Sequence, residues 1–216
     1  MKSFQRLALC IALVACVSPA VGAAHAAPTE RVVLAGGCFW GMQAVFASLN
    51  GVTKTVAGYA GGSAGTANYE AVSSETTHQA ESVQITFDPQ RISFRQLLDV
   101  YFLVAHDPTE LNRQGPDSGP SYRSEIFYTS NAQRVQAQAM IASLERRHVF
   151  HAPIVTQLER LPAFYPAEAY HQNYLVDNPQ SPYIVYNDIP KLRALQARFP
   201  QLVNPASAPM RVIAAR

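Results

Sequence analysis

Cysteine is scarce in this chain of 216 residues, with only Cys10, Cys16 and Cys38 present. Cys10 and Cys16 lie in an apolar stretch near the N-terminus, so Cys38 is alone in the remainder of the chain. In an exported protein, a lone cysteine excludes an internal disulfide as a source of stability. Cys38 is then a buried inert residue, half of an intermolecular bridge or a reactive thiol.

Long hydrophobic runs are lacking as well. The most apolar stretch, "LALCIALVACV", covers only residues 7–17, which is short for a membrane-spanning helix, and Ser18-Pro19 breaks it. It follows the positive start "MKSFQR" and precedes the small residues "SPAVGAAHA", the layout of a secretory signal peptide. An uncleaved first helix is disfavoured because no polar residue interrupts the run. We predict that residues 1–26 are a signal peptide.

Two processing routes stay open for this segment. The triplet "AHA" offers a cleavage site before Ala27, whereas "LVAC" resembles a bacterial lipobox, whose last residue, Cys16, would be lipidated and become the new N-terminus. Both routes predict export to the periplasm of a bacterium. Only lipidation at Cys16 would attach the protein to a membrane.

An excess of one charge is also missing. Lys and Arg number 17 and Asp and Glu 15, for a net charge of +2, and the basic residues are scattered. We therefore expect no nucleic-acid partner, because such a partner selects for a basic stripe. With 48% hydrophobic and 15% charged residues, the chain is globular rather than disordered or fibrous. The absence of repeats and linkers predicts one domain over residues 27–205, followed by a loose tail over residues 206–216.

Tryptophan occurs once, and Trp40 stands beside the lone thiol in "AGGCFWGM". Residues 31–35 read as a buried strand, and the apolar spacing over residues 39–50 predicts a helix directly after it. The free N–H groups at a helix start point toward a residue at the position of Cys38 and commonly lower the pKa of a thiol there. This favours a reactive Cys38, to which the preceding glycines leave access.

Strands and helices interleave along the rest of the chain. Strands are predicted within "VTKTVAGYAGG", "ESVQITFDP", "SEIFYTS" and "PIVTQLERL". Further helices are predicted in "SFRQLLDVYFLVA", where Ser93 and Gln96 form a capping box, in "AQRVQAQAMIASLERR", capped by Asn131, and from about Pro190. This order predicts an α/β or α+β sandwich in which helices cover a sheet.

Glu81 begins a strand in which apolar residues alternate with polar ones. The alternation places Glu81 on the same inward face as Val83, Ile85 and Phe87. Burial of a carboxyl raises its pKa, so that it stays protonated and can donate a proton. The alternative is a carboxylate in water at a frayed strand end.

Polar residues that could bind a neutral oxygen occur in two loops. Asp117 and Tyr122 lie in the polar loop over residues 107–122, and Tyr59 lies in "GYAGG". Tyrosine hydroxyls donate hydrogen bonds without adding charge. By composition alone, these residues could equally be turn residues and a surface tyrosine.

Five blocks together resemble the A-type peptide methionine sulfoxide reductases. They are "GCFWG", "GYAGG", "HQAESVQITFDP", "HDPTELNRQGPDSGPSYRS" and "YHQNYL", in that order, and the match runs from about residue 31 to residue 202. The resemblance implies reduction of the S epimer of methionine sulfoxide, in proteins or as the free amino acid. It also implies an α+β fold, an α/β sandwich around a mixed sheet with a ferredoxin-like core.

Matching positions imply a role for each candidate residue. Cys38 would be the nucleophile and Glu81 the acid that protonates the sulfoxide oxygen. Tyr59 and Tyr122 would hold that oxygen, and Asp117 would support the site. The adjacent aromatic rings, Phe39 and Trp40, would surround the S-methyl group of the substrate.

The chain departs from many members of this family in one respect. Those members carry resolving cysteines near the C-terminus, whereas no cysteine follows Cys38 here. A sulfenic acid at Cys38 would therefore need an external thiol, such as thioredoxin, glutaredoxin or a small thiol. The resemblance implies no metal and no organic cofactor, and we expect a monomer.

Two rival functions are consistent with a lone thiol. A thiol hydrolase would pair Cys38 with His78, His106 or His171, although no protease-like motif surrounds the cysteine. An exported binding domain for apolar peptides would use Cys38 only for packing. His171 is given no role.

Overall fold

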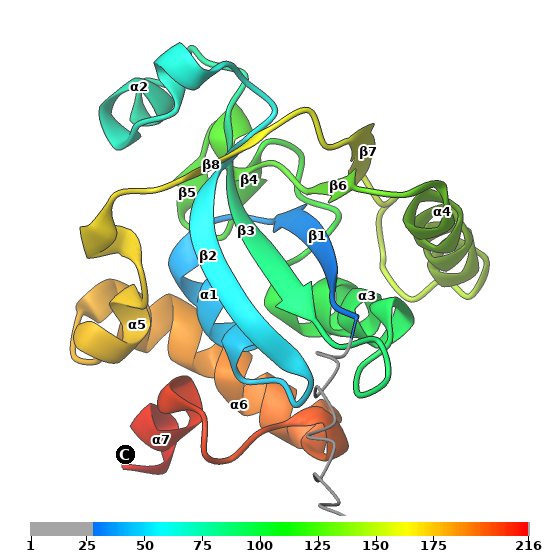
Figure 1. The fold of residues 1–216 in the computed structure, drawn as a ribbon, viewed down its shortest axis with the longest axis vertical. Helices are drawn as coiled ribbons and strands as arrows, with labels where there is room; N and C mark the ends of the chain where they lie inside the picture. Colours follow the sequence, from blue (N-terminus) through cyan, green and yellow to red (C-terminus); the bar gives the residue numbers. More distant parts are fainter. Residues whose placement is uncertain (1–27, 216) are drawn as a thin grey trace, which may run out of the picture.

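The computed structural model describes residues 28–215, so the predicted signal peptide over residues 1–26, including its lipobox, lies outside the described residues. One six-stranded sheet forms the centre of the fold (Figure 1). Its strands, in spatial order, are β7 (Gln157–Arg160), β6 (Glu125–Tyr128), β1 (Glu30–Ala35), β3 (Ala80–Phe87), β2 (Val52–Ala60) and β8 (Phe164–Pro166). Only β6 and β7 are parallel, so the sheet is mixed, as predicted.

Seven α-helices accompany the sheet in the described residues. They are α1 (Phe39–Ala47), α2 (Tyr69–Ser73), α3 (Phe94–Val100), α4 (Asn131–Arg146), α5 (Tyr174–Asp177), α6 (Ile189–Arg198) and α7 (Ala208–Ala214). Apart from the short insertions α2, β4 and β5, the chain order is β1-α1-β2-β3-α3-β6, and with the spatial order β6-β1-β3-β2 this is the ferredoxin-like arrangement. The predicted α+β fold is confirmed.

The two faces of the sheet are covered unequally. Because side chains alternate along a strand, β1 sends Val32 and Leu34 into the large core that the helices also fill, and Val33 to the opposite face. That opposite face holds a small cluster, against which Leu161 and Phe164 pack. Figure 1 shows α1 lying against the sheet, where it contacts β2 and β3, and α6 packs against α1 with α7 beside it. The helix that follows Cys38 is therefore held between the sheet and α6.

Several elements differ from the sequence predictions. The predicted loose tail was wrong for α7, because Met210 inserts into the main core and is almost fully buried. The N-cap of α4 is Ser130 rather than Asn131, because the Ser130 hydroxyl accepts the backbone N–H of Gln133. The polar loop over residues 107–122 contains a small hairpin, β4 (Arg113–Gln114) and β5 (Asp117–Ser118). The capping box of Ser93 and Gln96 is confirmed.

None of the helices within residues 28–215 combines the length and apolar character needed to cross a membrane.

Candidate active site

Cys38 is placed by the junction between β1 and α1. The buried strand β1 ends at Ala35, and Gly37 turns the chain with φ 84°, a backbone conformation that favours glycine. Cys38 then occupies the N-cap position of α1, as the sequence predicts, and its side chain is 7% exposed. The sulfur is thus held at the first turn of a helix, close to the molecular surface.

Glu81 lies on the same side of the molecule as Cys38. Its side chain is 4% exposed, and its Oε2 accepts the backbone N–H of Phe39 at 3.0 Å. Burial raises the pKa of Glu81 to about 8, although the hydrogen bond from Phe39 opposes the shift. The inward position predicted from the strand alternation is therefore confirmed, and the raised pKa favours the protonated carboxyl.

The surroundings of the Cys38 thiol differ from the prediction. Burial raises the pKa of Cys38 well above its ordinary value, and the neighbouring Glu81 and Asp188 raise it further. The backbone N–H of Trp40 lowers this pKa, as the helix start predicts, but its effect is smaller than that of burial. Burial therefore outweighs the helix start, and the surroundings of Cys38 favour a neutral thiol over the thiolate that the sequence predicts.

A small pocket of about 170 Å³ opens over the sulfur. Its lining consists of Cys38, Phe39, Trp40, Tyr69, Glu81, Asp117, Tyr122 and Tyr183. Six of the seven residues predicted from the sequence are thus brought together, and the seventh, Tyr59, is not. The pocket has the size of a small chemical group and combines aromatic walls with acidic and phenolic donors.

Trp40 is fixed by contacts on three sides. Its ring stacks on Tyr174 with centroids 3.7 Å apart and meets the edge of Tyr183 at 5.6 Å. Its indole N–H donates to Nδ1 of His171 at 3.1 Å. Burial lowers the pKa of His171, so the imidazole is neutral and can accept this bond. The indole is therefore pre-oriented at the pocket wall.

Tyr59 does not reach the pocket. It pairs with Glu81 across β2 and β3, but it is fully buried behind Phe39, with ring centroids 5.8 Å apart. Its hydroxyl donates to Glu168 at 2.9 Å and is therefore already used. The expectation that Tyr59 holds a substrate oxygen is contradicted by this bond.

Tyr69 and Tyr183 are the lining residues that the sequence prediction missed. Tyr69 begins α2, whose N-cap, Asn68, accepts the backbone N–H of Ala71; the motif "NYEA" with a capping Asn was the signal for this helix. Tyr183 comes from the C-terminal region, and its hydroxyl donates to Asp117. Nothing in the local sequence around Tyr183 indicates that contact.

Asp188 forms a buried ion pair beside the first turn of α1. Its Oδ1 lies 3.1 Å from Nζ of Lys191, and its side chain is fully buried. A Cβ added to Gly41 would lie 2.0 Å from the same Oδ1. Gly41, the second glycine of "GCFWG", is therefore needed so that the carboxylate can pack against the helix.

Gly41→Ala is expected to destabilise the protein by about 1–3 kcal/mol, the usual cost of overpacking a core. The paired Asp188 cannot move aside without leaving the Lys191 contact. Denaturant unfolding measures the effect. Gly65→Ala is the matched control, because no atom lies within 4 Å of its added Cβ. Equal unfolding midpoints for Gly41→Ala and the wild type would refute this account of Gly41.

The histidines do not form a hydrolase dyad with Cys38. His106 is buried, with its two ring nitrogens bonded to the Tyr101 carbonyl and the Ser124 hydroxyl. His171 holds Trp40, and His78 is exposed outside the pocket. No histidine within residues 28–215 lines the pocket, so the geometry does not favour the thiol hydrolase.

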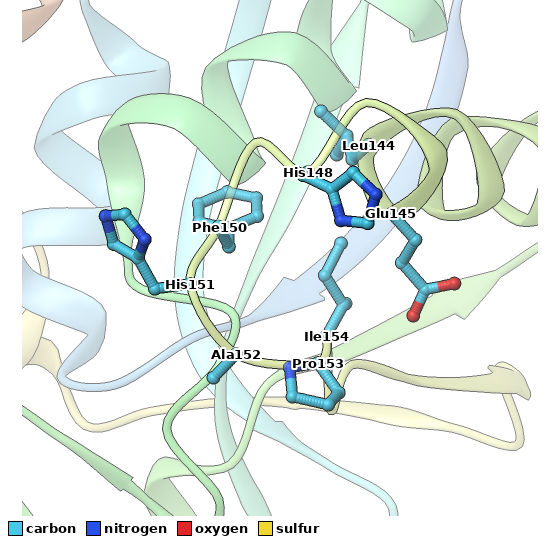
Figure 2. Close-up of a pocket in the computed structure, with 8 residues that line it drawn as sticks. All are labelled: Leu144, Glu145, His148, Phe150, His151, Ala152, Pro153 and Ile154. Atoms are coloured by element: carbon cyan, nitrogen blue, oxygen red, sulfur yellow. The ribbon is translucent and has the colours of Figure 1, made fainter.

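A second hollow, of about 300 Å³, lies at the end of α4 (Figure 2). Its apolar lining includes Leu144, Phe150 and Ile154, and it shares no residue with the Cys38 pocket. Figure 2 shows His148 and His151 on opposite sides of Phe150, so the imidazoles do not converge. In the described part of the chain, no three His, Cys, Asp or Glu residues are grouped to hold a metal ion.

A thiol that shares a pocket with a proton donor and has no histidine beside it suits nucleophilic attack coupled to proton donation. The family model described as "Peptide methionine sulfoxide reductase" matches residues 30–202. The chain therefore belongs to the peptide methionine sulfoxide reductase family, a family of oxidoreductases.

Similar proteins and structures agree with this assignment. Peptide methionine sulfoxide reductase MsrA 2 of Mesorhizobium japonicum is 52% identical, over 83% of this chain and 92% of that protein. Peptide methionine sulfoxide reductase MsrA of Chromobacterium violaceum is 45% identical, over 81% of this chain and 99% of that protein. The crystal structure of Mxr1 from Saccharomyces cerevisiae in reduced form has a TM-score of 0.65 and 33% identity, over 70% of this chain and 87% of that one.

Proposed function

We propose that this enzyme reduces the S epimer of methionine sulfoxide, in proteins or as the free amino acid, with Cys38 as nucleophile and Glu81 as general acid. The observation that carries this proposal is the shared pocket of a thiol and a carboxyl with a pKa of about 8. The Phe39 N–H occupies Oε2 of Glu81, which leaves Oε1 to carry the acidic proton toward a ligand.

The chemistry needs both groups. A sulfoxide oxygen leaves sulfur badly unless it is protonated, and Glu81 can supply that proton while the Cys38 sulfur attacks. The oxygen atom passes to Cys38, which becomes a sulfenic acid and is oxidised by two electrons; the substrate sulfur is reduced by two electrons and leaves as methionine. The proton of the thiol returns to Glu81, so the step balances.

The aromatic and phenolic groups would position the substrate. Phe39 and Trp40 would contact the S-methyl group, since both rings line the pocket and Trp40 is held by His171. Tyr122 and Tyr69 would donate to the sulfoxide oxygen, and Tyr69 takes the role first expected of Tyr59. Burial raises the pKa of Tyr122, which keeps its hydroxyl protonated as a donor.

Regeneration would use a thiol from outside the chain. No cysteine follows Cys38, so two external thiol groups, from thioredoxin, a glutaredoxin or a small thiol, would reduce the sulfenic acid and release water. The proposal requires neither a metal nor an organic cofactor. We further propose export to the periplasm through the N-terminal segment, either as a soluble protein or through a lipid at Cys16.

A stereospecific assay tests the proposal. With a small dithiol as reductant, the wild type should reduce a peptide with methionine S-sulfoxide and leave the R epimer at the background rate. After one equivalent of the S epimer without reductant, mass spectrometry should find one added oxygen on Cys38. Equal reduction of both epimers, or an internal disulfide instead of the sulfenic acid, would contradict it.

A further inference from the structure

Two exposed tyrosines stand together beside the active-site pocket. Among the described residues, Tyr69 is 38% exposed and Tyr170 is 61% exposed, and both rings contact His171, with centroids 4.6 and 4.2 Å away. Tyr69 also lines the Cys38 pocket. The aromatic surface is therefore continuous with the site where a sulfoxide would bind, and chain atoms next to that sulfoxide would lie over it.

The same surface is acidic. Glu168 accepts the backbone N–H of Tyr69 at 2.9 Å, and the hydrogen bonds that it accepts hold its pKa below the usual range. Glu70 follows Tyr69 at the start of α2 and is exposed. The two stretches that build this surface, residues 55–90 and 161–190, contain no lysine and no arginine. Its charge thus favours a cationic partner.

One polar group under this surface lacks a partner. His171 is 2% exposed, and its Nδ1 accepts the Trp40 indole, so the ring proton is on Nε2. No atom of the described residues accepts from Nε2. A buried donor of this kind is normally satisfied, so an unpaired N–H lies directly beneath the two tyrosine rings.

We propose that Tyr69, Glu70, Glu168 and Tyr170, which we term the acidic aromatic patch, bind a lysine or arginine that neighbours the methionine sulfoxide in a polypeptide substrate. Aromatic faces and carboxylates together attract such a side chain by cation–π and charge–charge interactions. This inference rests on the proposed function and adds a substrate class to it: oxidised methionine in basic segments.

Matched peptides test the inference. Two peptides with one methionine S-sulfoxide differ only in the flanking residues, which are lysine in one and glutamine in the other. The wild type should have a KM about threefold lower for the lysine peptide, with the same kcat, as expected for a cation–π contact at an exposed site. The difference should shrink at about 1 M salt, where charges are screened within ~3 Å.

Variants of Tyr170 show whether the lysine preference depends on the aromatic ring or only on the apolar area of the side chain. Tyr170→Leu should lose most of the lysine preference, whereas Tyr170→Phe should keep it. Glu70→Gln should weaken the preference, and Val135→Ser, at an exposed apolar residue of α4, should leave it unchanged. All four should reduce free methionine S-sulfoxide at the wild-type rate, because none of these residues lines the pocket.

Three further outcomes of these experiments would contradict the inference or the function on which it rests. Equal KM values for both peptides in the wild type would refute it while the reduction of free methionine S-sulfoxide still supports the proposed function. No reduction of the free sulfoxide would instead refute the proposed function. An effect of Tyr170→Leu on the KM of the reducing thiol alone would assign the patch to the reductant and not to the substrate.

Discussion

Cys38→Ser should abolish the reduction of methionine sulfoxide, with a loss of at least about 10⁴-fold in kcat/KM, the scale on which removal of a nucleophile acts. The variant has no sulfur to accept the oxygen atom, and a serine hydroxyl does not form a stable oxidised equivalent. Steady-state assays with a small dithiol measure the loss, and single-turnover mass spectrometry should show no added oxygen.

The control for this prediction is a measurement of whether the Cys38→Ser variant is still folded. Serine is nearly the same size as cysteine, and the site lies at the rim of the core, so the variant should keep the wild-type circular dichroism spectrum and nearly its melting temperature. Cys38→Ala provides a second inactive variant without a new hydroxyl. Substantial activity in either variant, with an intact fold, would refute the assignment of Cys38 as the nucleophile.

Glu81→Gln should lower the rate of the chemical step by about 10³-fold at pH 7, which lies within the range that general acid catalysis provides. Below pH 8 the wild-type carboxyl is mostly protonated, because its pKa is about 8; above pH 8 the proton donor is lost. The wild-type single-turnover rate should therefore fall as the pH rises above 8, because the protonated carboxyl is lost. The rate of the Glu81→Gln variant should lack this decrease.

Stability distinguishes this effect from damage to the fold. The pKa of Glu81 is higher in the folded than in the unfolded protein, so its ionisation opposes folding. That penalty grows as the pH rises from the unfolded value toward 8 and is complete above it. Glutamine removes the penalty and still accepts the Phe39 N–H, so Glu81→Gln should be at least as stable as the wild type at pH 9. A wild-type rate in this variant would exclude Glu81 as the acid.

The positions of Cys38 and Glu81 could be predicted because each depends on a local rule. The glycine turn and the helical spacing after it fix Cys38 at a helix start, and the alternation along β3 turns Glu81 inward. The same local rules place Phe39 in the core. Periodicity determines which face a side chain occupies, and these residues need nothing more.

Contacts between distant segments could not be predicted. The hydroxyl of Tyr59 is taken by Glu168, 109 residues away, so a local motif could not distinguish Tyr59 from Tyr69 as the free donor. Tyr183 reaches Asp117 across 66 residues. The resting state of Cys38 depends likewise on burial and on distant carboxyls, which outweigh the helix start that the sequence displays.

The raised pKa of the buried Cys38 thiol has a consequence for the survival of the enzyme. Peroxides attack the thiolate far more readily than the thiol, and a second oxidation of a sulfenic acid gives a sulfinic acid that common thiols do not reverse. Because burial raises the pKa of Cys38, little of its sulfur is present as the thiolate that such oxidants attack. A thiol that is proposed to reduce an oxidised substrate is thereby protected from irreversible oxidation itself.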